Sequence, residues 1–250
     1  MHKARKRFGQ NFLTDSRVID KIITAISPKR NDNFLEIGPG KGAMTLPLLE
    51  YLNQLNVIEI DKDLIKLLNS YNNDSLIVYQ GDILKFDIYQ LPKPLRIVGN
   101  LPYNISSPIL FHLLNQREHI EDMTFMLQKE VVERIVAKNG SKTYGRLSVM
   151  IQAHFDVEMI FTVPPECFDP EPKIDSAIVY LKPIANNLVK DFNIFEKVVK
   201  LSFSQRRKTL KNCLKSILTQ EITSIDLSQR AEALSVKDFI ELTKDYEKQY

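Results

Sequence analysis

Short apolar runs alternate with helical patterns along most of this chain, and this alternation limits the fold more than any other feature. The runs expected to be strands are Phe34–Ile37, Val57–Ile60, Leu76–Gln80, Leu95–Val98, Met123–Leu127 and Val149–Phe155, with Ile178–Leu181 as one more, antiparallel strand. The segments between them predict helices near residues 43–53, 63–70, 106–115 and 129–138. Alternation of this kind predicts an α/β fold, in which helices cover both faces of a parallel sheet.

The two ends of the chain differ from this central pattern. Residues 1–13 form a basic arm, and a helix with isoleucines at helical spacing follows it and stops before Pro28. Residues 186–250 contain neither proline nor glycine and have the pattern of short amphipathic helices. We therefore predict two domains, 1–185 and 186–250, which a chain of 250 residues is long enough to form.

Composition excludes several classes of protein. Cys167 and Cys213 lie far apart without a C-x-x-C motif, and the four histidines lack metal-ligand spacing, so we expect neither disulfide nor metal. No apolar run approaches the ~18 residues of a membrane span, and the basic N-terminus lacks the apolar core of a signal peptide. We expect a cytoplasmic protein with no membrane partner. The net charge of +3 is too small to indicate nucleic-acid binding by itself. The positions of the basic residues along the chain are more informative.

Polar residues follow three successive strands, where a ligand would bind in a doubly wound sheet. The first strand runs into a glycine-rich turn, Gly38-Pro39-Gly40-Lys41-Gly42, whose glycines permit close approach of backbone to a ligand. Glu59 or Asp61 after the second strand could accept both hydroxyls of a ribose, and Asp82 after the third could accept from an adenine amine. These features suit NAD and S-adenosylmethionine equally.

The tetrapeptide Asn100-Leu101-Pro102-Tyr103 ends the fourth strand and favours one particular chemistry. The exocyclic amine of a nucleobase is a poor nucleophile, because its lone pair is delocalised into the ring. The Asn100 side-chain oxygen and a main-chain carbonyl could accept its two N–H bonds, which would aim the lone pair at a methyl donor. The ring of Tyr103 could stack on the base. A nicotinamide dehydrogenase has no use for this motif.

Many motifs together resemble those of the ribosomal RNA adenine dimethyltransferases of the KsgA type, over nearly the whole chain. They are Phe8–Leu13, Glu36–Gly40, Val57–Asp61, Val98–Ser106, Met126–Arg134, Tyr144–Val149, Val163–Pro165 with Phe168, Pro170–Ala177 and Gln205–Leu210. The resemblance implies a Rossmann-like, S-adenosylmethionine-dependent methyltransferase core and a small all-helical C-terminal domain. It also implies dimethylation of N6 on two adjacent adenosines near the 3′ end of small-subunit ribosomal RNA.

Site residues can be carried over from the family by motif. The resemblance implies cofactor contacts at Asn11, Leu13, Gly38, Glu59, Asp82 and Asn100. It implies a catalytic group of Asn100, Leu101, Pro102, Tyr103 and Phe168, in which Tyr103 and Phe168 bracket a flipped adenine. Without the resemblance, an aromatic residue such as Phe168 after two prolines is more often loop packing.

Basic residues predict where RNA is held. Arg206, Arg207, Lys208, Lys211 and Lys215 fall in one expected helix whose leucines, Leu210, Leu214 and Leu218, form a buried stripe. The second candidate is the N-terminal arm, with Lys3, Arg5, Lys6 and Arg7. We expect a monomer that binds small-subunit ribosomal RNA within an assembling subunit. The alternatives are a large-subunit ribosomal RNA methyltransferase of the antibiotic-resistance type and a non-catalytic assembly factor of the same fold.

Overall fold

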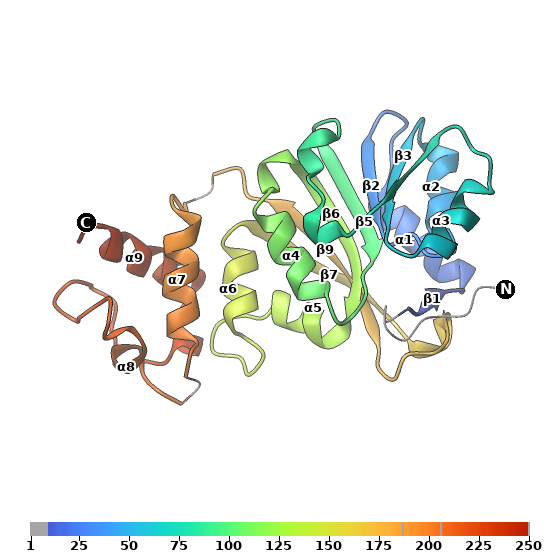
Figure 1. The fold of residues 1–250 in the computed structure, drawn as a ribbon. Helices are drawn as coiled ribbons and strands as arrows, with labels where there is room; N and C mark the ends of the chain where they lie inside the picture. The colour runs from blue at the N-terminus through green and yellow to red at the C-terminus, as the bar shows by residue number, and fades with distance from the viewer. Residues whose placement is uncertain (1–9, 187, 206, 250) are drawn as a thin grey trace. The chain divides into compact units, whose positions relative to one another are not determined.

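The computed structural model describes residues 10–186, 188–205 and 207–249 of the chain (Figure 1). The chain divides into two compact units. The first comprises the chain up to Val132 together with Glu158–Pro183, and the second comprises Glu133–Val157 and the chain from Ile184 onward. One division, after Pro183, lies close to the boundary predicted near residue 185. The second unit also contains residues 133–157, which the sequence pattern assigns to the first domain.

A seven-stranded sheet organises the first unit, in the order β4-β3-β2-β5-β6-β9-β7. The first five of these strands are parallel, and β9 pairs with β6 in the antiparallel direction, as predicted. Their bounds are β4 Leu76–Gln80, β3 Leu55–Glu59, β2 Asn33–Ile37, β5 Leu95–Asn100, β6 Ile120–Gln128, β9 Ser176–Pro183 and β7 Phe155–Val163. A separate antiparallel pair joins β1, Phe12–Leu13, to β8, Phe168–Asp169.

Helices lie on both sides of the sheet in the first unit. The helices α1 (Ser16–Ile26), α2 (Thr45–Tyr51) and α3 (Lys62–Asn69) lie on one side, and α4 (Ser106–Leu114) lies on the other (Figure 1). The α1 helix starts at Asp15, whose carboxylate accepts from the backbone N–H of Arg17 and Val18. It ends at Ser27, which takes the left-handed conformation with φ of 48° ahead of Pro28.

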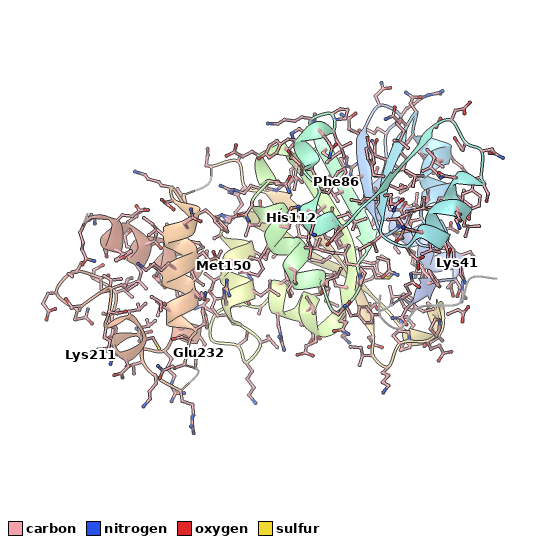
Figure 2. The ribbon with its side chains drawn as sticks, in the orientation of Figure 1. Lys41, Phe86, His112, Met150, Lys211 and Glu232 are labelled. Carbon is pink, nitrogen blue, oxygen red and sulfur yellow. The ribbon has the colours of Figure 1, made fainter. Side chains whose placement is uncertain are left out.

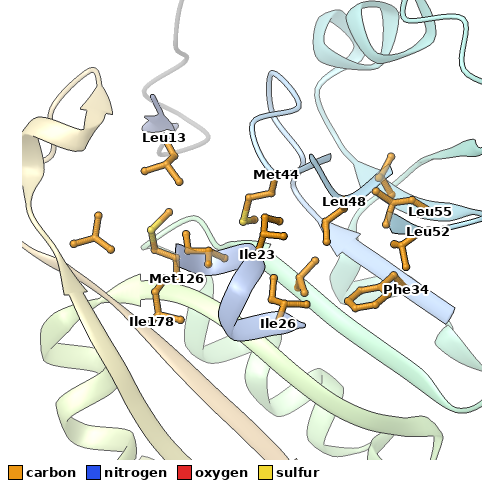
Figure 3. Close-up of a cluster of buried hydrophobic side chains, with 14 of the residues drawn as sticks. Leu13, Ile23, Ile26, Phe34, Met44, Leu48, Leu52, Leu55, Met126 and Ile178 are labelled. Carbon is orange, nitrogen blue, oxygen red and sulfur yellow. The ribbon is translucent and has the colours of Figure 1, made fainter. Parts of the chain in front are cut away.

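The isoleucine stripe of α1 packs into a cluster of buried side chains (Figure 3). Ile22, Ile23 and Ile26 meet Phe34 and Leu55 of the sheet there. The cluster extends through α2 and also contains Leu13, Met126, Ile178 and Phe168. Burial of each such side chain contributes roughly 1.5–3 kcal/mol, so the β1–β8 pair is held onto the first unit by its apolar residues.

A buried arginine fixes α1 to the amino ends of the sheet strands. The Arg96 guanidinium donates to both oxygens of Asp122 at 3.0 and 3.1 Å, and to Asp32 at 2.8 Å. It also donates to the carbonyl of Ile26, at the last turn of α1, at 2.7 Å. With all these donors satisfied, the charge is compensated inside the protein.

The prediction of a strand at Val149–Phe155 is wrong. Arg146–Gln152 forms helix α6, and the strand β7 starts only at Phe155. A continuous apolar run does not distinguish a buried strand from a buried helix, and four successive residues, Ser148–Ile151, are buried here. The backbone N–H of Gly145 donates to the Ser148 hydroxyl at 3.0 Å, which favours the start of a helix.

Helices form the second unit, as the sequence pattern predicts for the C-terminal segment. Besides α6 they include α7 (Phe192–Ser202), α8 (Leu210–Leu214) and α9 (Val236–Glu247), while α5 (Lys129–Ile135) leads into this unit. The α7 helix contacts α6, α8 and α9. These contacts give the physical reason why residues 146–152 belong to this unit. The rings of Phe203 and Phe239 stack in its core with centroids 5.6 Å apart.

Candidate active site

A cavity of about 300 Å³ opens where β2, β3, β4 and β5 end, all within the first unit. Its lining comes from residues 10–13, from the glycine-rich turn after β2, and from the chain that follows β3, β4 and β5. Parallel register brings these strand ends together, since Ile37 lies opposite both Ile58 and Gly99, and Glu59 lies opposite Gln80. Ligands of open α/β sheets bind at this edge.

Two glycines near the cavity lie so close to their neighbours that an added side chain would displace those neighbours. Gly40 has φ of 58°, and a Cβ there would lie 3.1 Å from the ring of Phe12. Gly99 on β5 is tighter still, since a Cβ would lie 2.6 Å from the carbonyl oxygen of Ile37. These two glycines let the turn and the end of β5 meet at the cavity.

Glu59 turns its carboxylate toward the cavity, and the backbone holds it there. One oxygen accepts from the N–H groups of Ile60 at 2.8 Å and Asp61 at 2.9 Å, and the other accepts from Gly40 at 3.4 Å. Burial raises the pKa of Glu59, and these backbone hydrogen bonds oppose the shift. The group is 6% exposed. It is therefore a rigid acceptor at the cavity wall.

The structure separates Glu59 from Asp61, which the strand pattern cannot do. Asp61 caps α3 by accepting from the N–H of Asp63 at 3.0 Å, and it also accepts from Gln10 at 3.3 Å. It does not line the cavity, whereas Glu59 does. Asp82 lines the cavity as well, while its carboxylate accepts from the N–H of Leu84 at 3.0 Å in the turn after β4.

Asn100 ends β5 with its amide oriented by the N-terminal segment. Its Nδ2 donates to the carbonyl oxygen of Asn11 at 3.0 Å, so its Oδ1 is the amide atom that can accept from a ligand. Leu101, Pro102 and Tyr103 also line the cavity. The Tyr103 hydroxyl lies 2.7 Å from Ser176 Oγ. Burial raises the pKa of Tyr103, so this phenol stays protonated.

Phe168 does not lie with the other candidate residues at the cavity. It is 3% exposed, pairs with Leu13 across β1 and β8, and belongs to the buried cluster of the first unit. Leu13 itself belongs to that cluster and lines the cavity too. The segment bearing Phe168 is thus linked to the cavity through β1.

Sequence reasoning assigned no role to Glu36, which lies on the cavity wall at 1% exposure. The Thr45 hydroxyl donates to its carboxylate at 2.6 Å. Burial raises the pKa of Glu36 to about 7, and the negative charge of Glu59 adds to the shift. The sequence does contain a sign that Glu36 has a special role, because it is an acidic residue within the apolar run Phe34–Ile37.

A family model describes the chain almost from end to end. The model for ribosomal RNA adenine dimethylases matches residues 1–248. The chain belongs to this family. As a ribosomal RNA adenine dimethylase, it is an S-adenosylmethionine-dependent methyltransferase with ribosomal RNA as its substrate.

Individual relatives are similar over the same length. A protein of Nitrosospira multiformis named ribosomal RNA small subunit methyltransferase A is 50% identical, with 97% of this chain and 96% of that protein covered. A protein of the same name from Pseudomonas syringae pv. tomato is 53% identical, with 96% and 94% covered.

Solved structures agree with the Rossmann-like fold. A dimethyladenosine transferase of Plasmodium falciparum matches with a TM-score of 0.83 and 28% identity, covering 95% of this chain and 98% of that one. The 23S rRNA methyltransferase ErmE matches with a TM-score of 0.75 and 25% identity, covering 95% and 100%.

The basic residues proposed to hold RNA are only partly described. Lys3, Arg5, Lys6, Arg7 and Arg206 lie outside the described residues. Arg207, Lys208, Lys211 and Lys215 are exposed, and Lys211 projects from α8 (Figure 2). They do not share one helix as predicted, because α8 covers only Leu210–Leu214. The N–H groups of Leu210 and Lys211 donate to Gln229 and Leu227, so residues 227–229 determine where the helix begins.

Neither a candidate metal site nor a candidate membrane span occurs in the described part of the chain. Within it, no group of three or more histidine, cysteine, aspartate or glutamate side chains is arranged to hold a metal ion. None of its helices is long and apolar enough to cross a membrane.

Proposed function

We propose that this dimethylase transfers two methyl groups to N6 of each of two adjacent adenosines near the 3′ end of small-subunit ribosomal RNA. Identities of 50% and 53% over nearly the full length to proteins named small subunit methyltransferase A support this target. The structural relative that acts on 23S rRNA is only 25% identical. This difference in identity is our reason for preferring the small-subunit target to the large-subunit one.

The cavity suits S-adenosylmethionine in both size and polar groups. We propose that Glu59 accepts from the two ribose hydroxyls, that Asp82 accepts from the adenine amine, and that the backbone at Gly38 lies against the ligand. Asn11 and Leu13 would complete this site from the N-terminal segment. When bound, the cofactor supplies an electrophilic methyl group attached to a sulfonium.

The catalytic role proposed here rests on one observation: Asn100 lines the cavity, and the hydrogen bond to Asn11 fixes the orientation of its side-chain amide. We propose that its Oδ1 and a main-chain carbonyl of the Asn100–Tyr103 segment accept hydrogen bonds from the two N–H groups of the target amine. The amine nitrogen then becomes more tetrahedral, and its lone pair is aimed for attack. Tyr103 would stack on the base, which offsets the cost of unstacking it by ~1–3 kcal/mol. No strong base is needed, because the methylated amine is acidic and loses its proton to water.

We propose that the basic residues around α8 hold the RNA through its phosphates, which recognises charge rather than sequence. The arm of residues 1–13 would act together with them. We further propose that the enzyme works as a monomer in the cytoplasm, on an assembling small subunit. Flipping a target adenosine would cost less wherever that base is already unpaired.

The experiment compares three substrates under single-turnover conditions with labelled S-adenosylmethionine: free small-subunit RNA, immature small subunits and free large-subunit RNA. Nucleoside mass spectrometry should detect N6-dimethyladenosine at two adjacent positions of the small-subunit RNA. Asn100→Ala should reduce the rate by ~10²-fold or more while the melting temperature stays near wild type. Label in large-subunit RNA alone would overturn the target, and a wild-type rate for Asn100→Ala would overturn the mechanism.

A further inference from the structure

Residues 10–13, here called the strap, connect parts of the first unit that lie far apart in the sequence. Gln10 donates to Asp61 after β3, and Asn11 accepts from Asn100 at the end of β5. Phe12 packs on Gly40 of the glycine-rich turn, and Leu13 pairs with Phe168 of β8. All four strap residues line the cavity.

Phe12 is the main anchor of the strap. It is 8% exposed, and its ring takes the space that a side chain at Gly40 would need, 3.1 Å from the ideal Cβ. The Lys41 ammonium lies 4.5 Å from the ring centroid, in cation–π geometry. Just beyond the strap, the N–H of Thr14 donates to Cys167 at 2.8 Å. Together with the hydrogen bond from Gln10 to Asp61, these contacts hold Asn11 from both sides.

The contact between Asn11 and Asn100 determines which way the amide faces. A carbonyl oxygen accepts hydrogen bonds and cannot donate, so only the Nδ2 end of the amide can lie favourably 3.0 Å from it. A flipped amide would place two oxygens against each other and lose the hydrogen bond. The orientation of this side chain is therefore imposed by the strap backbone.

We propose that the strap is a positioning element for catalysis: the Asn11 carbonyl holds the Asn100 amide with Oδ1 toward the target amine. This inference rests on the proposed role of Asn100 as amine acceptor. Because the strap also lines the cofactor cavity, binding the cofactor and presenting the acceptor are one coupled event. The enzyme is then competent to receive an adenine only when the strap is in place.

The test loosens the strap without altering Asn100. Phe12→Ala removes the anchor, and Phe12→Leu restores an apolar side chain as the conservative rescue. Leu52→Ala is the matched control, because Leu52 belongs to the same buried cluster but does not line the cavity. If Phe12→Ala does not fold, Gln10→Ala, which removes the bond to Asp61, takes its place. Each variant is measured at saturating cofactor, so that affinity and turnover are separated.

We expect the single-turnover rate of Phe12→Ala at saturating cofactor to fall by about tenfold or more, and Phe12→Leu to recover most of it. Leu52→Ala should lower the melting temperature while keeping the saturating rate. In protein labelled with ¹⁵N-asparagine, the Asn100 side-chain signals, assigned by their loss in Asn100→Ala, should move toward random-coil positions in Phe12→Ala only.

Two failures can be told apart. If Asn100→Ala is inactive but Phe12→Ala keeps the wild-type saturating rate and unchanged Asn100 signals, the strap has no positioning role and the proposed function stands. If Asn100→Ala methylates at the wild-type rate, the proposed function itself fails.

Discussion

The hydroxyl of Thr45 donates a 2.6 Å hydrogen bond to the carboxylate of Glu36, and Glu36 forms part of the wall of the cavity at the strand ends. Thr45 and Glu36 are 0% and 1% exposed. The hydrogen bond favours the ionised form of Glu36, but burial outweighs it and the pKa rises to about 7. An acid of this kind makes the stability of the fold depend on pH.

Glu36→Gln should remove that dependence. In the native state Glu36 keeps its proton up to pH about 7, whereas in the unfolded chain its pKa is the ordinary glutamate value of 4.5. The native state binds more protons between these values, so wild-type stability falls as pH rises through this window and levels off above it. Relative to Glu36→Gln, the wild type should lose up to ~3 kcal/mol between pH 4 and pH 8, by urea unfolding. A stability difference that is the same at both pH values would contradict this.

Glu59→Ala should weaken binding of S-adenosylmethionine, because the ribose hydroxyls lose a charged acceptor. Charge-assisted hydrogen bonds contribute ~1.5–3 kcal/mol, so calorimetric titration should give a Kd raised by roughly tenfold to a hundredfold. Glu59→Gln keeps the side-chain volume and an acceptor oxygen, so it should lose less affinity for S-adenosylmethionine than Glu59→Ala does. Asp74→Ala, which removes an exposed acid outside the cavity, serves as the control. An unchanged Kd for Glu59→Ala would remove Glu59 from the proposed site.

Sequence reasoning located the strand ends well, since hydrophobic alternation and turn residues are local signals. It therefore predicted that Glu59, Asp82 and Asn100 would meet at one edge. It could not choose between Glu59 and Asp61, because a strand pattern does not reveal that Asp61 caps α3 and accepts a hydrogen bond from Gln10. The burial of Phe168 depends on the β1–β8 pair, which joins residues that are far apart in the sequence. Local patterns carry no information on such pairs.

Two errors in the helical part have the same origin. The apolar run at Val149–Phe155 has no clear period, and its helix is stabilised by packing on α7 and α9. The basic helix predicted around Arg206–Lys215 has suitable propensity, yet the helix observed is only Leu210–Leu214, and the N–H groups of its first two residues donate to the backbone of Gln229 and Leu227. In both places tertiary contacts override the local preference.

Gly99→Ala should disturb the end of β5. A Cβ at this position would lie 2.6 Å from the carbonyl oxygen of Ile37, and this backbone atom, held in the sheet, cannot move aside easily. Overpacking of this kind costs ~1–3 kcal/mol, so the melting temperature and the position of the adjacent Asn100 should both be affected. Gly145→Ala is the matched control: its backbone is extended with φ of −166°, and a Cβ there meets nothing within 4 Å. Equal stability for the two variants would contradict the close approach.

Replacing Arg207, Lys211 and Lys215 with Ala should weaken RNA binding and flatten its dependence on salt. Each lost phosphate contact should reduce the log–log salt slope by about one unit, and cofactor affinity should hardly change. A triple variant of Lys21, Lys62 and Lys66, which are exposed on α1 and α3, removes the same charge elsewhere. If both triple variants keep the wild-type slope in filter-binding titrations, the residues around α8 do not contact phosphate.

Tyr103→Ala and Tyr103→Phe should separate stacking from hydrogen bonding. The alanine variant loses the ring and with it ~1–3 kcal/mol of stacking on the flipped adenine, so both capture of the base and the methylation rate should fall. The phenylalanine variant keeps the ring and loses only the 2.7 Å contact with Ser176, which orients the side chain. We expect it to retain most of the activity, and Ser176→Ala to match it, since both remove the same bond. Fluorescence of 2-aminopurine at the target position reports capture, and single-turnover transfer reports rate. A Tyr103→Phe enzyme as impaired as Tyr103→Ala would mean that the hydroxyl, not the ring, is what this position provides.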